Sequence, residues 1–311
     1  MTDSLEFGIM LSATSNAYGI PDAKLPAVFR RSARTAEANG FDVVVAGDHV
    51  VYPDTIPSDY EYSSSGEPPF NTDTSVYDVF QVLSHLAAVT DDIDLGTNVV
   101  AAPYRHPLVL TKNILSLDSL SAGRVDLGVA PGWLATEFDA LDVPFAERGA
   151  RTDEFLEIFE LARENATASY EGEFHQFDAV GFHPRPAHDI PVWIGGKSGA
   201  AIRRVGQFGT GWTTLWDHPS DVADTRKRIM QAWTDFNRTG DPEIAVLRPV
   251  NLDAGADPDR LLSGGPESII EDIESYREAG VTRLIVDFFT TDVDEQVALM
   301  NRFGDEIIDA L

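Results

Sequence analysis

The sequence predicts an α/β fold, a (β/α)8 TIM barrel with insertions at the carboxyl-terminal face of its strands. Short apolar runs of the fully buried type alternate strictly with segments in which apolar residues recur at helical spacing. Eight such pairs can be counted in 311 residues, which is the length that a closed barrel of eight units requires. A doubly wound open sheet is the alternative that this pattern leaves.

The first half of the chain holds four βα units, and local signals mark several of their boundaries. Gly40 ends the first helical segment, and Pro107 stands at the start of the third, where proline is favoured. The valine-rich run 41–47 is typical of a strand buried on both faces. The strands are expected at 5–11, 41–47, 93–101 and 125–130, and the helices at 25–39, 76–90, 107–120 and 151–165, with a short helical stretch from 134.

The second half repeats the alternation four more times. Prolines at 219 and 266 mark the starts of two helices. The strands are expected at 190–195, 211–215, 244–251 and 284–289, and the helices at 198–208, 219–237, 266–279 and 293–310. All eight units therefore form a single domain over residues 1–311.

Two segments exceed what a minimal barrel needs. Residues 52–74 form a long loop rich in glycine, proline and serine, and residues 168–189 alternate aromatic and polar side chains, which predicts a hairpin. Both are counted after strands, so we expect both to project over the carboxyl face, where barrel active sites are built.

The chain carries a large excess of negative charge. Its 51 acidic and 23 basic side chains give a formal charge of -28, which makes nucleic acid a poor partner. Lysine occurs at only four positions, and this composition resembles that of proteins from salt-accumulating halophiles. The negative charges of such a surface repel one another, and this repulsion is screened at about 1 M salt, where the Debye length falls to roughly 3 Å. We expect a protein that requires salt, with an ordinary acidic mesophilic protein as the alternative.

Other features of the composition exclude several kinds of site. The absence of cysteine excludes disulfides, thiolate metal sites, iron–sulfur clusters and cysteine nucleophiles. The histidines show no metal-ligand spacing, so no metal site is expected. The longest apolar runs are far shorter than the roughly 20 residues of a membrane span, and no basic-then-apolar signal opens the chain. We expect a cytoplasmic protein that does not enter the membrane.

A glycine-bearing turn connects the fifth predicted strand to its helix. The backbone N–H groups at Gly195 and Gly196, the Ser198 hydroxyl and the positive end of the helix dipole all favour a phosphate, and Lys197 adds charge. A Walker-type loop is excluded because Pro191 stands where that motif requires glycine. The alternative is a plain helix start.

Three other strand ends carry candidate site residues. His49 follows the second strand and points into the barrel mouth, where it is either a proton-transfer group or structural. Asn98 is polar at the end of the third strand and serves a cofactor or caps the strand. The glycine-bearing turn that ends at Trp133 either lets a flat ligand approach closely or merely turns the strand into a helix.

Taken together, these motifs resemble the luciferase-like monooxygenase superfamily, in particular its subgroup of oxidoreductases dependent on the deazaflavin coenzyme F420. The resemblance covers nearly the whole chain, and the order and spacing of its pieces make it specific. The pieces are Gly40-Phe-Asp, Gly47-Asp48-His49, Leu95-Gly-Thr-Asn98, His106-Pro107, Gly123-Arg124, Gly132-Trp133, Glu137-Phe138, Pro144-Phe-Ala-Glu-Arg148, Trp193-Ile-Gly-Gly196, Gly211-Trp212 and Gly265-Pro-Glu267.

The resemblance implies a cofactor site and a substrate side. A non-proline cis peptide between Asn98 and Val99 would support the flavin ring from one side. Gly195, Gly196, Lys197 and Ser198 would hold the cofactor phosphate, and His49 would face the substrate. The residues that would line the cofactor ring and side chain are Ala130, Pro131, Gly132 and Trp133.

One position departs from the family pattern. Relatives that oxidise sugar phosphates or alcohols carry a glutamate just after the glycine that matches Gly132, and this chain has Trp133 there. Their substrates are therefore not carried over to this chain. Glu137, one helical turn further on, is either a replacement proton donor or acceptor, or a carboxylate on the helix surface.

The resemblance implies hydride transfer between coenzyme F420 and a small organic substrate, with His49 as proton donor or acceptor and the loop 52–74 as a lid that selects the substrate. The alternative is a monooxygenase that uses reduced FMN, since the same barrel and phosphate loop serve both cofactors. A non-catalytic flavin-binding barrel is the second alternative. Family members often form homodimers, so a homodimer is expected. The aromatic residues of the lid would be Tyr52, Tyr60, Tyr62 and Phe70.

Overall fold

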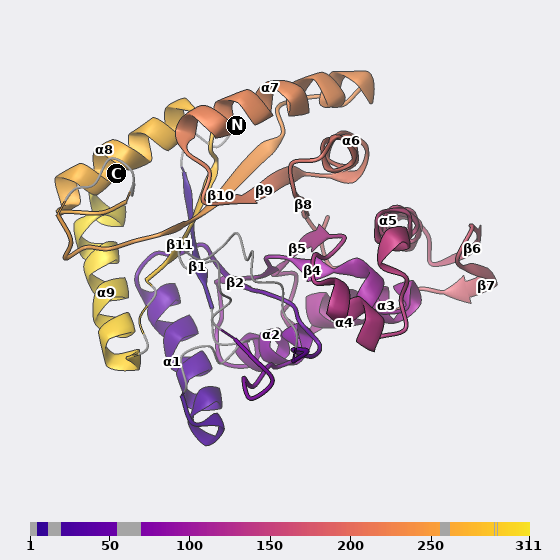
Figure 1. Ribbon diagram of the computed structural model, residues 1–311, viewed down its shortest axis with the longest axis horizontal. Helices are drawn as coiled ribbons and strands as arrows, with labels where there is room; N and C mark the ends of the chain where they lie inside the picture. Colours follow the sequence, from indigo (N-terminus) through magenta and orange to yellow (C-terminus); the bar gives the residue numbers. More distant parts are fainter. Residues whose placement is uncertain (1–4, 12–19, 55–69, 256–261, 289, 291) are drawn as a thin grey trace.

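Eight parallel strands close into a barrel in the computed structural model of the chain (Figure 1). The structure describes residues 5–11, 20–54, 70–255, 262–288, 290 and 292–311. The strands follow one another in the order β3, β2, β1, β11, β10, β9, β8 and β5, and the pairing of β3 with β5 closes the ring. The predicted (β/α)8 barrel is confirmed, and the open sheet is excluded.

Each predicted strand is present, with bounds within a few residues of those expected. The third one is interrupted by a cis peptide between Asn98 and Val99, as the family resemblance implies. Its second piece, β4 (Val100–Ala101), pairs with the end of β5. The eight barrel strands are β1 (Glu6–Met10), β2 (Val43–Ala46), β3 (Asp94–Thr97), β5 (Val125–Ala130), β8 (Val192–Gly195), β9 (Gly211–Leu215), β10 (Glu243–Pro249) and β11 (Arg283–Asp287).

The helices surround the barrel, and the last one lies beside the first (Figure 1). A short extra helix, α4 (Ala135–Ala140), follows β5 before the long helix of that unit. Within the described residues, none of the helices is long and apolar enough to cross a bilayer. The helices of the eight units are α1 (Leu25–Ala38), α2 (Val79–Ala87), α3 (Pro107–Leu120), α5 (Arg148–Glu164), α6 (Gly199–Phe208), α7 (Pro219–Asp235), α8 (Pro266–Glu278) and α9 (Val293–Glu306).

Strand side chains alternate between two apolar clusters, because successive residues of a strand point to opposite faces. The outward side chains, such as Val44 and Val246, pack against the helices in the main core. The inward side chains fill the barrel, and they include Val43, Val45 and Leu247. Both faces of each strand are buried, which explains the continuous apolar runs of the sequence.

The barrel closes between β3 and β5 because Gly128 lets the two strands approach closely. A Cβ atom at Gly128 would lie 1.9 Å from the carbonyl oxygen of Thr97. The Thr97 hydroxyl accepts the Gly128 N–H at 2.9 Å and donates to the Gly128 carbonyl at 2.7 Å. This contact holds β5 directly against the end of β3, where the cis peptide follows.

Charged side chains close the amino-terminal end of the barrel. The Arg283 guanidinium pairs with Glu6 at 2.7 Å and with Asp126. Burial and the nearby Asp126 carboxylate raise the pKa of Asp94 to about 6, although Arg283 opposes the shift. This end of the barrel therefore holds a carboxyl group that titrates above its usual range.

The two insertions differ in what the structure describes. Of the loop 52–74, residues 55–69 with Tyr60 and Tyr62 lie outside the described residues. The predicted hairpin is confirmed as the antiparallel strands β6 (Thr167–Glu171) and β7 (Gln176–Gly181). Its expected place over the carboxyl face is wrong, because the segment follows helix α5 and not a strand.

The hairpin packs along the outside of α5 instead. The Tyr170 hydroxyl donates to Glu157 at 2.6 Å, and Glu154 accepts hydrogen bonds from Phe174 N–H at 2.9 Å and His175 at 2.8 Å. Figure 1 shows β6 and β7 beside α5, at the edge of the molecule. The hairpin thus extends the wall of the barrel and does not cover its mouth.

Candidate active site

The site lies where β2, β3, β5 and β8 end, and its central contact joins His49 to Glu137. His49 follows β2, and its Nδ1 lies 2.7 Å from Oε2 of Glu137 in α4. The His49 side chain keeps 18% of its surface exposed, whereas the Glu137 side chain is fully buried. Glu137 is therefore not a carboxylate on the helix surface, and that alternative is wrong.

Glu137 accepts hydrogen bonds from several groups at once. Its Oε1 accepts the N–H groups of Val50 at 2.6 Å and Val51 at 3.2 Å, and its Oε2 accepts the Tyr104 hydroxyl at 2.8 Å. Burial raises the pKa of this carboxyl, but the hydrogen bonds that it accepts outweigh burial and hold the pKa below its usual range. The carboxylate is thus charged.

A charged carboxylate on Nδ1 decides which ring nitrogen of His49 can exchange a proton. Nδ1 must donate to Glu137, so Nε2 is the nitrogen left for chemistry. Burial and the Glu137 charge raise the pKa of the Tyr104 phenol, which keeps it a donor to the same carboxylate. Glu137 therefore orients His49, and its own oxygens are already occupied.

An ion-pair network that sequence reasoning missed fixes the end of β2. The Arg105 guanidinium donates to both oxygens of Asp48, at 2.7 and 2.9 Å, and to Asp78 at 2.9 Å. Asp48 also accepts the Ala101 N–H at 3.1 Å, which ties β2 to β4. The signal available was the pair of charged residues Asp48, at a predicted strand end beside His49, and Arg105, beside His106 just before a predicted helix.

Small residues surround the cis peptide at the end of β3. The inward faces of β2, β5 and β8 end in small residues, which are Gly47, Ala130 and Gly195. A Cβ atom at Gly195 would lie 3.3 Å from the Cβ atom of Ala130 and 3.4 Å from Cγ1 of Val99. The Asn98 Oδ1 accepts the Thr213 hydroxyl at 2.9 Å. Its Nδ2 is buried without a hydrogen-bond partner among the described residues. Val99, Ala130 and Gly195 together form a flat wall. This wall fits a flat ligand that carries a hydrogen-bond acceptor for the Asn98 Nδ2 group.

The predicted phosphate loop connects β8 to α6. Gly196 has a φ of 102°, and the Ser198 hydroxyl caps α6 by accepting the Ala201 N–H at 3.1 Å. Trp212 Nε1 donates to the Gly196 carbonyl at 2.8 Å and anchors the loop. Lys197 is ion-paired with Asp217, so the loop presents backbone N–H groups more than a free charge.

The turn after β5 carries the remaining predicted residues. Pro131 lies between Ala130 and Gly132. Gly132 has a φ of 86°, and a Cβ atom there would lie 2.9 Å from the Phe138 ring. Trp133 is 38% exposed, and its ring lies edge-on to His49 with the ring centroids 6.1 Å apart. The Trp133 ring therefore lies on the His49 side of the site.

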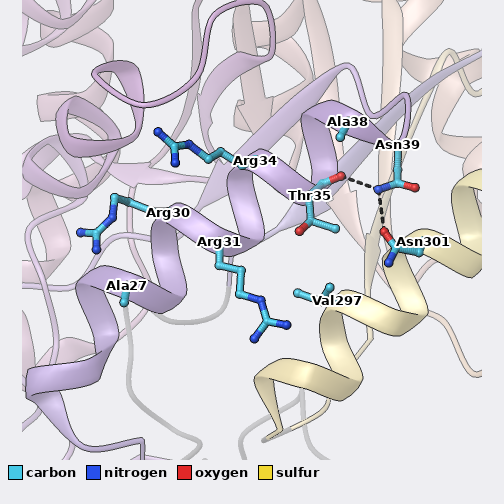
Figure 2. A pocket seen from close by; sticks show the side chains of 9 residues that line it. All are labelled: Ala27, Arg30, Arg31, Arg34, Thr35, Ala38, Asn39, Val297 and Asn301. Atoms are coloured by element: carbon cyan, nitrogen blue, oxygen red, sulfur yellow. Dashed lines mark hydrogen bonds between the residues drawn. The ribbon is translucent and has the colours of Figure 1, made fainter.

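A separate groove of about 440 Å³ lies between α1 and α9, on the outer ring of helices (Figure 2). It carries Arg30, Arg31 and Arg34, and in Figure 2 the Arg30 and Arg34 side chains extend to one side of α1 and the Arg31 side chain to another. Arg31 is ion-paired with Asp294, and Arg34 donates to the Val89 carbonyl at 2.9 Å. None of the predicted site residues lines the groove.

In (β/α)8 barrel enzymes the active site lies at the carboxyl ends of the strands, which is where His49, Glu137 and Asn98 lie in this chain. Residues 5–260 match the family described as luciferase-like monooxygenase. The chain belongs to this family. It is an oxidoreductase that uses a flavin or a deazaflavin.

Similar proteins include both characterised and uncharacterised ones. An uncharacterised protein of Mycobacterium tuberculosis is 28% identical over 82% of this chain and 83% of its own length. The F420-dependent glucose-6-phosphate dehydrogenase of Nakamurella multipartita is 24% identical over 89% of this chain and 90% of its own.

Solved structures share the fold. Monooxygenase RslO1 from Streptomyces bottropensis superimposes with a TM-score of 0.82 at 21% identity, covering 98% of this chain and 99% of that one. The oxygenating constituent of 3,6-diketocamphane monooxygenase from Pseudomonas putida, in complex with FMN, has a TM-score of 0.76 at 15% identity and covers 99% of both chains. At these identities the likeness concerns the fold alone.

Proposed function

We propose that the protein transfers a hydride between coenzyme F420 and a small organic substrate, with His49 as the group that gives or takes the accompanying proton. The observation that carries the proposal is the His49–Glu137 pair at 2.7 Å, beside the flat wall of Val99, Ala130 and Gly195. The F420-dependent relative from Nakamurella multipartita supports the choice of cofactor.

The residues of the wall and of the loop fit a deazaflavin with a phosphate-bearing side chain. Asn98 and Val99 would support the ring, and the unpartnered Asn98 Nδ2 would donate to it. The phosphate would be held by backbone N–H groups of the loop and by the positive end of α6. The bound deazaflavin supplies the hydride acceptor or donor. In this proposal the contacting residues are Asn98, Val99, Ala130, Pro131, Gly132, Gly195, Gly196, Lys197 and Ser198.

His49 performs the proton transfer because Glu137 holds its ring in one orientation and one tautomer. With Nδ1 donating to the carboxylate, Nε2 takes a proton from a substrate hydroxyl or, when protonated, gives one to a carbonyl oxygen. A histidine is suited to both directions near neutral pH. Glu137 acts through His49 and touches neither substrate nor cofactor.

One observation favours the reduced-FMN monooxygenase as a second candidate. Coenzyme F420 carries an acidic polyglutamate tail, and three cations near the phosphate loop are already paired, which leaves Arg228, whose guanidinium donates to the Lys197 carbonyl at 3.2 Å. Lys197 pairs with Asp217, and Arg203 and Arg204 both pair with Asp153 at 2.8 Å. FMN has no such tail and makes no demand on these cations.

Titration of the purified protein in high salt with coenzyme F420 and, separately, with FMN tests the proposal. The absorption spectrum of each cofactor reports binding, and we expect F420 to bind at least tenfold more tightly than FMN. Tight FMN binding with no F420 binding would reverse the order of the two candidates. Turnover by the wild-type protein separates both candidates from a non-catalytic barrel, which would bind the cofactor without turnover, and a loss of turnover in His49→Ala with cofactor still bound would assign the proton transfer to His49.

A further inference from the structure

We propose that Arg228 of α7 binds the carboxylates of the coenzyme F420 tail, and that this contact makes the site prefer F420 to FMN. The inference rests on the proposed function and deepens it, because it assigns a residue of this chain to the part of the cofactor that FMN lacks. It depends on three features of the described residues, which are the exposure of the phosphate loop, the position of the Arg228 guanidinium and the state of the other cations nearby.

The phosphate loop passes from the buried barrel wall to the molecular surface within one residue. Gly195 is buried, whereas residues 196–200 are all exposed. A Cβ atom at Gly199, the first residue of α6, would meet open space. The tail of coenzyme F420 continues beyond the phosphate. A tail attached to a phosphate on this loop therefore leaves the barrel at the surface, beside the start of α6.

Arg228 stands next to this exit. Its Nη2 donates to the Lys197 carbonyl, in the middle of the phosphate loop, at 3.2 Å, and the residue is exposed. The contact fixes the guanidinium against the loop without neutralising it, because the acceptor is an uncharged carbonyl. Arg228 makes this one hydrogen bond to the described residues, and a guanidinium has five N–H donors in a fork that matches a carboxylate. The remaining donors can therefore bind a carboxylate of the tail.

The other cations described around the loop are held by carboxylates or buried. The ion pairs are those of Lys197 with Asp217 and of Arg203 and Arg204 with Asp153.

Arg248, at the end of β10, differs from these three because it has no carboxylate partner among the described residues. It donates to the Trp216 carbonyl and is only 5% exposed, so its guanidinium is not open to a tail that runs along the surface. Arg228 is therefore the guanidinium near the loop that is both exposed and not held by a described carboxylate.

The carboxylates of α7 do not cancel the charge of Arg228. Asp224, one turn earlier, is paired with Lys227 at 2.7 Å. Asp221 is two turns earlier, which is about 10 Å along a helix, whereas the Debye length is roughly 3 Å at about 1 M salt. The same screening weakens the repulsion between the tail and a chain of formal charge -28. Direct contacts then decide how tightly the tail is held.

Two deazaflavins that differ only in the tail test the inference by binding alone. One is F420 with five glutamates, and the other is the deazaflavin 5′-phosphate, which is F420 cut after its phosphate. Absorbance titration at one high salt concentration gives a dissociation constant for each. We expect the wild-type protein to bind F420 at least threefold more tightly than the phosphate. Equal affinities, or tighter binding of the phosphate, would overturn the inference.

Variants of α7 assign the effect to Arg228. Arg228→Gln should weaken F420 binding about threefold to fivefold, the size of an exposed charge-assisted contact, and should leave the affinity for the deazaflavin 5′-phosphate within about 1.5-fold. Arg228→Lys keeps the charge but not the fork and should lose less F420 affinity than Arg228→Gln. Lys227→Gln is the matched control, because it makes the same change of charge one residue away, at a side chain paired with Asp224.

Two results with these variants would contradict the assignment. An equal loss for both deazaflavins in Arg228→Gln would mean that Arg228 contacts the phosphate and not the tail. Equal losses of F420 affinity in Arg228→Gln and Lys227→Gln would mean that any positive charge on α7 has the same effect. Thermal unfolding of each variant shows that the fold is intact.

The deazaflavin 5′-phosphate separates this inference from the proposed function. If the wild-type protein binds neither deazaflavin but binds FMN, the proposed function is contradicted. If it binds both deazaflavins and Arg228→Gln binds them as the wild type does, only the assignment of Arg228 is contradicted.

Discussion

His49 and Glu137 are 88 positions apart in the chain, yet Nδ1 of the imidazole lies 2.7 Å from Oε2 of the carboxylate. The same carboxylate also accepts the N–H groups that follow His49 and the Tyr104 hydroxyl. One buried charge therefore fixes both the ring and the backbone that carries it. A histidine fixed in this way is oriented before a ligand arrives.

Replacement of His49 by alanine should lower turnover by about 10²- to 10⁴-fold, the range typical of general acid–base catalysis. Cofactor affinity should stay within about twofold, because His49 would face the substrate in the proposed reaction. Steady-state kinetics and cofactor titration measure the two effects. The matched control is His175→Ala, which breaks another histidine–glutamate pair, in which His175 on the hairpin lies 2.8 Å from Glu154 of α5. Equal turnover in wild type and His49→Ala would remove His49 from the mechanism.

The variant Glu137→Gln keeps the volume but removes the charge that orients His49. We expect kcat to fall by about 10- to 100-fold, a smaller loss than for His49→Ala, with little change in KM. Nitrogen-15 NMR of the histidine rings should show that the His49 tautomer is no longer uniform. A variant with reduced kcat but the wild-type tautomer would contradict the orienting role. Glu154→Gln in α5, which removes the carboxylate that pairs with His175 of the hairpin, is the matched control.

An alanine at Gly195 should separate cofactor binding from folding. Its Cβ atom would stand 3.3 Å from that of Ala130, in the wall that we assign to the flat ring. We expect cofactor affinity to drop at least tenfold, while the free energy of unfolding falls by only about 1 kcal/mol. Absorbance titration and denaturant unfolding measure the two quantities. Gly255→Ala has open space around the added atom and should affect neither. Undiminished cofactor binding in Gly195→Ala would place the ring elsewhere.

The barrel end opposite the site should respond to pH through Asp94, whose pKa is raised to about 6. In the unfolded chain this carboxyl titrates near about 3.9, so the folded state binds the proton more tightly. Its contribution to stability is therefore lost as the pH rises from about 4 through about 6. At pH 8 the free energy of unfolding of Asp94→Asn should exceed that of wild type by about 1–2 kcal/mol, a figure reduced because Asp94 is partly exposed to solvent. Near pH 4 the two proteins should be equally stable.

Denaturant unfolding of both proteins across this pH range measures the difference. Asp305→Asn removes an exposed carboxylate in α9 and serves as the control. If the free energies of unfolding of wild type and Asp94→Asn differed by the same amount at pH 4 and at pH 8, the raised pKa of Asp94 would be contradicted.

Salt should stabilise the whole molecule, since the chain carries a formal charge of -28. Raising the sodium chloride concentration from about 0.1 M to about 2 M shortens the Debye length and screens the repulsion among surface carboxylates. We expect the melting temperature to rise steadily over this range in calorimetry at constant pH. A melting temperature independent of salt would mean an ordinary acidic protein.

The positions of strands and helices were predictable because they depend on local periodicity. The range of β9 and that of α3 agree with the sequence-based prediction at both ends, and the valine-rich run around β2 signalled burial on both faces. The hairpin was predicted from its alternation, but its location was not. The residues around Ala168 follow a helix, and only the packing of Tyr170 and His175 on α5 shows which face of the barrel they extend.

The sequence by itself determined the barrel, its strand ends and the residue types that stand there, because hydrophobic period, glycine and proline act within a few residues of the chain. Only the tertiary structure decided which side chains meet. Closure of β3 on β5 brings α4 back to β2, so that Glu137 reaches His49, and the connection after β9 brings Asp217 to Lys197. Such contacts join residues far apart in the chain, and barrel closure, which no local pattern encodes, creates them.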